Sequence, residues 1–251
     1  FSMSGRGLPG IDRLRRPTNC GCYNAHRLRT NKKTALMLEL GVKFLLSYFL
    51  GSVMGALLIG RLRGGVDIRT AGSGNAGGTN ALRTQGWLFA LGVVVIDIGK
   101  GAIGAGLIPA LDLPFIDDGA NVSFDWLVVC CAAAAVMGHV WPIWHEFRGG
   151  KGAATLIGTL IVMSPTLIAP VLIAWSVVLV LTGYVGLSTM CAGITAPLWL
   201  ALTTLPANQP LFIYCVAMAA YLVFSHRSNI RRMRAGTENR MTRAMLFRRQ
   251  S

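Results

Sequence analysis

After residue 36, the chain is a succession of apolar stretches, most of them long enough to cross a lipid bilayer. A helix needs about 20 mostly apolar residues to do so, and fewer when it enters only partway. Seven stretches qualify: residues 38–60, 87–111, 124–144, 153–163, 165–182, 187–205 and 210–225. The pattern predicts an all-α integral membrane protein with seven transmembrane helices, of which the fourth is short.

Composition excludes an ordinary soluble domain. Only 14% of the residues are charged and the mean hydropathy is +0.53, whereas soluble domains carry about 25% charged residues. The short fourth stretch is either a half-span or the start of one long helix that bends at Ser164 and Pro165. Glycine and alanine recur through residues 99–106 and 130–138, which suits close packing between helices in lipid.

The cysteines indicate neither a disulfide framework nor a cofactor. Cys130, Cys131, Cys191 and Cys215 lie in apolar stretches, where a thiol behaves as a small hydrophobic group. The single C-x-C pair in the polar amino-terminal segment is a weak metal signal. We expect no metal and no cofactor.

Lys and Arg in short loops predict the orientation, because these residues are retained on the cytoplasmic side. They follow the first, third and seventh stretches, whereas the loops after the second, fourth and sixth have none. Seven spans then place the amino end outside and the carboxyl end in the cytoplasm. Residues 37–238 form the membrane domain, and residues 239–251 form a basic cytoplasmic tail.

Residues 1–36 have no apolar period and no signal-peptide pattern, and we expect a basic disordered tail. They carry eight Lys or Arg residues against the single Asp12, which conflicts with an outside location. Either the tail is tolerated, or it is not native and translation starts at Met37. We favour the second interpretation.

Three glycine- and charge-rich segments, residues 67–80, 138–155 and 226–238, lie at the ends of apolar stretches on this same face. In the first, Gly72, Ser73, Gly74 and Asn75 leave backbone amides open to wrap an anion, and Arg69 and Arg83 flank them. A tight turn between helices that needs positive φ angles is the alternative.

The second segment carries Lys151 among glycines that include Gly149 and Gly150. A P-loop would need a glycine where His145 stands and a hydroxyl where Gly152 stands. The sequence therefore excludes a nucleoside triphosphatase, but an amide nest with one ammonium suits a monophosphate.

The third segment places His226, Asn229 and Glu238 among four arginines. A positive-inside anchor explains the arginines alone. His139 fits helix-end packing and function equally well. Asp97 and Lys100, three residues apart, share one helix face, and we expect an ion pair that faces the bundle because charges in lipid are costly unless paired.

These segments resemble the three signature motifs of the bacterial acyl-phosphate:glycerol-3-phosphate acyltransferase family. GSGNAGGTNALR is similar to the first, with Gly78 where alanine is commoner. GHVWPIWHEFRGGKGAAT is similar to the second, with Arg148 in place of lysine, and HRSNIRRMRAGTE to the third. The resemblance covers residues 51–238. It implies a seven-helix fold in the bacterial inner membrane with its active site facing the cytoplasm.

The resemblance also implies the reaction, in which a fatty acyl group passes from acyl phosphate to the 1-hydroxyl of glycerol 3-phosphate. The products are lysophosphatidate and phosphate. Matched residue by residue, the motifs imply catalytic roles for Ser73, Arg83, Lys151, His226 and Asn229. The predicted phosphate-binding positions are Arg69, Gly72, Gly74, Asn75, Gly149, Gly150, Ser188 and Glu238, where Ser188 replaces the serine of the family's R-Y-V-S-L pattern.

Acyl phosphate is already activated, so we expect positioning and charge stabilisation instead of a protein nucleophile. Either His226 or an oxygen of the donor phosphate takes the hydroxyl proton. The H-x-x-x-x-D pattern of the common glycerolipid acyltransferases is absent. We expect the bilayer and these two substrates as partners, no nucleic acid, and a monomer. An organophosphate transporter is the alternative, and it would need basic residues converging from both faces.

Overall fold

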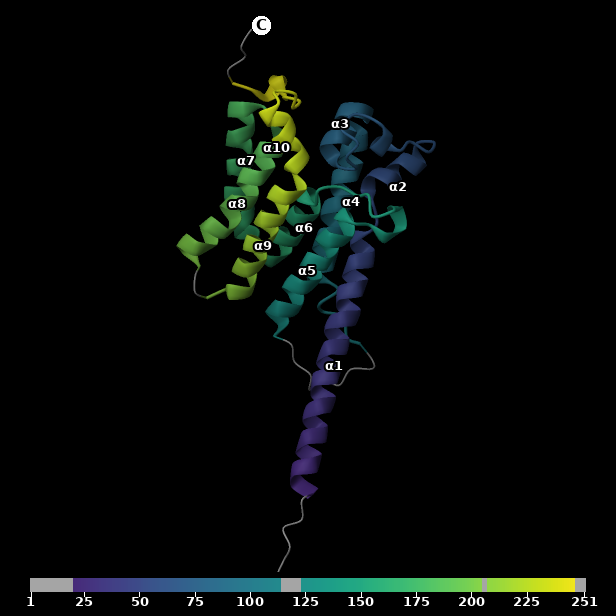
Figure 1. Cartoon of the computed structure of the whole chain (residues 1–251), viewed down its shortest axis with the longest axis vertical. Coiled ribbons are helices and arrows are strands. Elements are labelled where there is room, and N and C mark those ends of the chain that lie inside the picture. Colours follow the sequence, from purple (N-terminus) through teal and green to yellow (C-terminus); the bar gives the residue numbers. More distant parts are fainter. Residues whose placement is uncertain (1–19, 114–122, 205–206, 247–251) are drawn as a thin grey trace, which may run out of the picture.

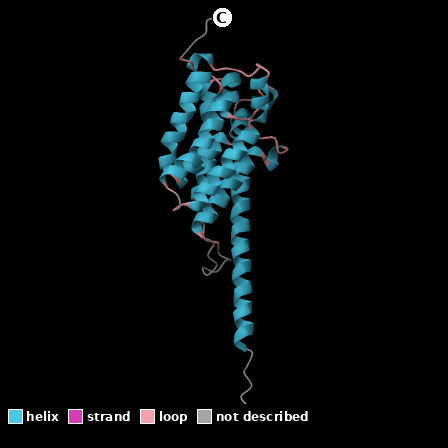
Figure 2. Ribbon diagram, turned by 60° about the vertical axis from the view of Figure 1, so that its left-hand side comes forward, coloured by secondary structure: helices cyan, strands magenta, loops and turns pink. Residues whose placement is uncertain are grey.

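The computed structural model describes the backbone of residues 20–113, 123–204 and 207–246, with side chains from residue 34 onward except Arg243. The regular secondary structure of this part is entirely helical, joined by loops, and includes no strand (Figures 1 and 2). Its α-helices are α1 (Cys20–Gly51), α2 (Gly55–Leu62), α3 (Gly78–Gln85), α4 (Trp87–Gly106), α5 (Phe124–Val140), α6 (Ala153–Met163), α7 (Ile168–Thr182), α8 (Val185–Thr203), α9 (Gln209–Ser225) and α10 (Arg227–Arg234).

Helix α1 is longer than the sequence pattern predicts. It begins at Cys20 and projects from the bundle as one continuous helix (Figure 1). The expected disorder is therefore wrong for residues 20–36, and residues 1–19 lie outside the described part. Arg, Lys, Leu and Ala are favourable in helices, and a helix already nucleated by an apolar span extends at low cost because only the first turn is expensive.

The predicted first span, residues 38–60, is wrong as a single helix, because the chain breaks between Gly51 and Gly55. Two side chains of α4 satisfy the backbone groups freed there. The Lys100 Nζ donates to the Val53 carbonyl at 2.6 Å, and the Gly55 N–H donates to Asp97 Oδ1 at 3.3 Å. The predicted ion pair is confirmed, with Lys100 Nζ 3.0 Å from Asp97 Oδ1.

Glycines let the central helices approach closely. Where α4 meets α6, a methyl group at Gly101 would overlap the Thr155 carbonyl, and one at Gly158 would overlap the Ile98 carbonyl. The α1–α5 contact uses Gly138 in the same way against the Tyr48 carbonyl. The expected close packing along residues 99–106 and 130–138 is confirmed.

Helix α6 is a separate short helix and not the first half of a long bent one. It ends at Met163, packs along α4, and is followed by α7, which packs along α8. By length and apolar composition, five helices within the described residues can cross a membrane: 34–51, 87–106, 124–145, 165–182 and 185–203. A sixth is present if α9 and α10, which meet at 50°, form one span.

The carboxyl-terminal segment returns to the bundle. The Met241 N–H donates to the Gly183 carbonyl at 2.8 Å, and the Arg240 guanidinium lies 4.7 Å from the centre of the Tyr184 ring. Residues 239–246 therefore pack over the connection between α7 and α8, and Asn239 reaches the cavity described next.

Candidate functional site

A cavity of about 390 Å³ brings the three glycine- and charge-rich segments together. Its polar wall consists mainly of side chains from these segments: Ser73, Asn75, Thr79, Arg83, Lys151, His226, Asn229, Arg232, Glu238 and Asn239. Its apolar wall comes from α4 and α6 to α9: Val94, Ile98, Leu156, Ile157, Leu160, Val171, Leu172, Trp175, Val185, Ala192, Ala196, Cys215, Met218, Ala219 and Leu222. The cavity thus has a charged part and an apolar part that runs between helices.

Asn80 organises the first segment. Its Nδ2 donates to the carbonyls of Ile68 and Ala71, both at 3.0 Å, and its Oδ1 accepts the Ser73 N–H at 2.9 Å. Gly72 has a φ of +61°, and a Cβ there would overlap the Asn80 amide. The turn therefore does need its glycine, as the alternative interpretation held, and it presents Ser73 and Asn75 to the cavity.

Arg69 links the first two segments instead of lining the cavity. Its guanidinium pairs with Asp67, Nη2 to Oδ2 at 2.8 Å, and also donates to the His145 carbonyl at 3.3 Å. This pairing raises the pKa of Arg69 and lowers that of Asp67. Arg69 therefore holds the two loops together.

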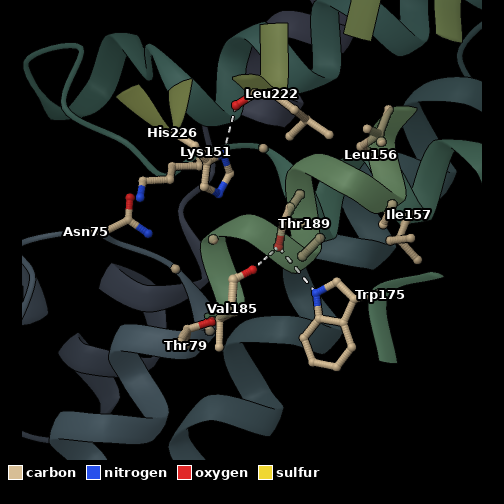
Figure 3. Close-up of a pocket in the computed structure, with 18 of the residues that line it drawn as sticks. Asn75, Thr79, Lys151, Leu156, Ile157, Trp175, Val185, Thr189, Leu222 and His226 are labelled. Atoms are coloured by element: carbon tan, nitrogen blue, oxygen red, sulfur yellow. Dashed lines mark hydrogen bonds between the residues drawn. The ribbon is translucent and has the colours of Figure 1, made fainter. Parts of the chain in front are cut away.

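Lys151 begins a hydrogen-bonded chain across the polar wall. Its Nζ donates to Asn229 Oδ1, and the Asn229 Nδ2 donates to Glu238 Oε1 at 2.8 Å. Glu238 also pairs with Arg232, Oε2 to Nε at 2.6 Å. Burial, helped by the nearby Arg232 charge, lowers the pKa of Lys151 to about 8. The ammonium is therefore charged at neutral pH and points toward Asn75 (Figure 3).

His226 sits between α9 and α10 with a defined tautomer. Its Nδ1 lies 2.8 Å from the Leu222 carbonyl (Figure 3), which only accepts, so Nδ1 carries the proton and Nε2 is left as an acceptor. Burial, followed by the charge of Lys151, lowers the pKa of His226 to about 4. The imidazole is therefore neutral at pH 7 and a weak base.

The structure brings seven of the thirteen sequence-predicted site residues to the cavity wall, including all five with expected catalytic roles: Ser73, Asn75, Arg83, Lys151, His226, Asn229 and Glu238. The remaining positions are not on that wall: Arg69, Gly72, Gly74, Gly149, Gly150 and Ser188. Ser188 is buried, and its hydroxyl donates to the Tyr184 carbonyl at 2.9 Å.

Thr79, Arg232 and Asn239 line the cavity but were not predicted as site residues. Arg232 belongs to a run of arginines that a positive-inside membrane anchor explains, so the sequence pattern did not mark it as a site residue. Its spacing carried the signal, because Asn229 and Arg232 are three apart on one helix and so face the same side.

The charge distribution of the polar wall suits an anion. Arg83, Lys151 and Arg232 bring three cationic groups to it, against the carboxylates of Glu238 and Asp97. Because Asp97 is paired with Lys100 and Glu238 with Arg232, positive charge remains for a phosphate. The adjoining apolar part suits an alkyl chain, so the cavity fits an amphipathic phosphate ester or its precursors.

Comparison with known proteins agrees with this geometry. The family model described as glycerol-3-phosphate acyltransferase matches residues 42–236. The glycerol-3-phosphate acyltransferase of Salinibacter ruber is 36% identical over 215 residues, covering 82% of this chain and 94% of the relative. That of Symbiobacterium thermophilum is 37% identical over 205 residues, covering 82% and 96%.

Two crystal structures of PlsY (YgiH), an integral membrane glycerol 3-phosphate acyltransferase, are similar to this fold. The glycerol 3-phosphate form has a TM-score of 0.69 at 30% sequence identity and covers 80% of this chain and 95% of that one. The lysophosphatidic acid form has a TM-score of 0.68 at the same identity. The chain therefore belongs to the glycerol-3-phosphate acyltransferase family and is an integral membrane enzyme.

Proposed function

We propose that the protein transfers a fatty acyl group from acyl phosphate to the 1-hydroxyl of sn-glycerol 3-phosphate. The products are lysophosphatidate and inorganic phosphate, the first acylation of bacterial phospholipid synthesis. The observation that carries the proposal is one cavity with a cationic wall and an apolar wall. Both substrates have a phosphate, which the cationic wall can bind. The donor also has an alkyl chain, which the apolar wall can hold.

The cationic groups act on the phosphates. Lys151 and Arg83 bind them and, with loop amides and the Ser73 hydroxyl, stabilise the charge that develops on the acyl oxygen and on the departing phosphate. Asn229 and Glu238 orient Lys151 through the hydrogen-bonded chain described above. Holding both substrates in one cavity makes their reaction effectively unimolecular.

The reaction needs no protein nucleophile. The 1-hydroxyl oxygen attacks the acyl carbon, the bond from that carbon to the phosphate oxygen breaks, and the proton passes to an oxygen of the departing phosphate. With a pKa of about 4, His226 is poorly matched to removing this proton, because an effective general base has a pKa near the working pH. His226 Nε2 orients the hydroxyl by accepting its hydrogen bond before transfer.

The site lies on the cytoplasmic face of the inner membrane, in a chain that crosses it seven times with the amino end outside. The amino-terminal end of α1 and helix α10 lie at opposite ends of the bundle (Figure 1), which supports an odd number of crossings. We count α6 as the fourth crossing, although this apolar helix is shorter than the five that meet the length criterion. The basic loops after the first, third and seventh spans support this orientation. Residues 37–238 supply every catalytic side chain, which supports activity as a monomer.

The donor assay tests this function directly. Purified protein in detergent is given glycerol 3-phosphate with acyl phosphate, acyl-CoA or acyl carrier protein in separate reactions. We expect lysophosphatidate and equimolar phosphate with acyl phosphate alone. Product from acyl-CoA but not from acyl phosphate would contradict the proposed donor. Uptake of glycerol 3-phosphate into liposomes without acylation would indicate the transporter instead.

The lowered pKa of Lys151 predicts a pH dependence. Because the phosphate is held by the ammonium, kcat/KM for glycerol 3-phosphate should be highest below pH 8 and fall as the pH rises through about 8. In Lys151→Arg the guanidinium stays charged in this pH range. The residual kcat/KM of this variant should therefore decline only at higher pH. A falling limb at the same pH in both proteins would show that another group titrates.

A further inference from the structure

A buried polar cluster adjoins the cavity without a role in the chemistry above. Asp97 of α4 and His139 in the last turn of α5 are 1% and 2% exposed, and both reach the cavity wall. The Asp97 carboxylate is fixed by Lys100 at 3.0 Å and by the Gly55 N–H at 3.3 Å. The carboxylate is therefore a rigid acceptor shared by the α1–α2 break, α4 and α5.

The cluster sets the orientation of the imidazole. His139 Nδ1 lies 3.4 Å from Asp97 Oδ1, within ion-pair distance, and makes no hydrogen bond within the described residues. The Asp97 carboxylate is the charged group nearest to Nδ1 and can only accept, which favours the tautomer with the proton on Nδ1, and Nε2 lies on the opposite edge of the ring. Lys100 already neutralises Asp97, so the ring does not need to be charged.

The opposite edge of this ring braces the second glycine-rich segment. A Cβ at Gly150 would overlap His139 Nε2, so only glycine fits against the ring. The Gly150 N–H donates to the His139 carbonyl and the Gly149 N–H to the Val140 carbonyl, both at 3.1 Å. The loop thus folds back onto the end of α5, and the next residue is Lys151.

We propose that His139 is a positioning residue: held by Asp97, its ring fixes the turn at Gly149 and Gly150, and this turn sets where the Lys151 ammonium meets the phosphate of glycerol 3-phosphate. The inference rests on the phosphate-binding role proposed for Lys151. It also gives the two glycines a function different from direct phosphate contact, since both lie off the cavity wall.

Binding of glycerol 3-phosphate to the purified full chain, measured by calorimetry, tests the proposal. His139→Ala should weaken binding roughly tenfold or more, the effect found where a residue holding a binding group is removed. In a Lys151→Ala background the same change should have little further effect, because His139 acts through Lys151. Equal losses in both backgrounds would overturn the proposal. If Lys151→Ala alone binds like the unaltered protein, the proposed phosphate site fails instead.

Gly150→Ala tests the brace from the other side. Gly150 does not have a positive φ, so the added methyl acts through the ring and should weaken binding as His139→Ala does. Combined with His139→Ala, it should weaken binding no further. Gly150→Ala that binds like the unaltered protein would overturn the proposal.

His145→Ala is the matched control, because this histidine lies six residues along the same segment and off the cavity wall; it should bind normally. A thermal unfolding midpoint is measured for each variant. If His139→Ala does not fold, His139→Asn replaces it, since asparagine keeps a donor for Asp97 but has no ring against Gly150. The proposal expects the same loss, and normal binding by His139→Asn would contradict it.

Discussion

Lys151→Ala is expected to reduce acyl transfer by a factor of at least about 10², while the protein stays folded and in the membrane. Removing one positioned donor from a site that stabilises developing charge costs about 10²–10³ in turnover elsewhere. Here the lost group is a full charge in a buried position. Its partner Asn229 remains hydrogen-bonded to Glu238 and so cannot replace it. The measurement is lysophosphatidate formation at saturating glycerol 3-phosphate, in protein whose elution and thermal unfolding match the unaltered chain.

Arg148→Ala is the matched control for this prediction. Arg148 is a cation three residues away in the same segment, but its side chain is exposed and does not line the cavity. Its loss should leave turnover near that of the unaltered protein. Comparable losses in both variants would show that the positive charge of the whole loop matters, and activity near normal in Lys151→Ala would remove the second segment from the site.

His226→Asn is expected to weaken binding of glycerol 3-phosphate more than it lowers turnover. The asparagine amide can still donate to the Leu222 carbonyl, as Nδ1 does now, but nothing replaces Nε2 in the cavity. Losing one hydrogen bond to a hydroxyl corresponds to about 1.4 kcal/mol, so KM should rise about tenfold. Initial rates over a range of glycerol 3-phosphate concentrations separate KM from kcat.

The same variant distinguishes the two proton acceptors. If His226 were the obligatory base, kcat at saturating substrate should fall by about 10²–10⁴, and that result would contradict transfer of the proton to the donor phosphate. Ser225→Ala is the control, because its hydroxyl lies 3.3 Å from His226 Nδ1 but does not line the cavity. It should change both constants little.

Much of the site could be predicted from the sequence because its signals are local. Lys151 stands among glycines, and His226 and Asn229 follow an apolar span, so their identities and spacing already suggest phosphate chemistry at a membrane surface. The structure brings all three to one cavity. The roles of the glycines in these turns were harder to predict. A loop that binds an anion with its backbone amides and a tight turn that needs positive φ angles both require glycine. Only the Asn80 hydrogen bonds show that Gly72 serves the turn.

The sequence by itself determined the helical membrane class and the segments that carry charge, because the lengths of apolar stretches and the cost of charge in lipid are properties of short windows. Tertiary structure alone decided the break after Gly51, whose free backbone groups are bonded by Lys100 and Asp97, more than forty residues away. It likewise placed the Arg69 guanidinium against the His145 carbonyl, which belongs to another segment of the chain. In each case the packing of distant segments decides which groups come within hydrogen-bond distance. A local sequence pattern does not specify these partners.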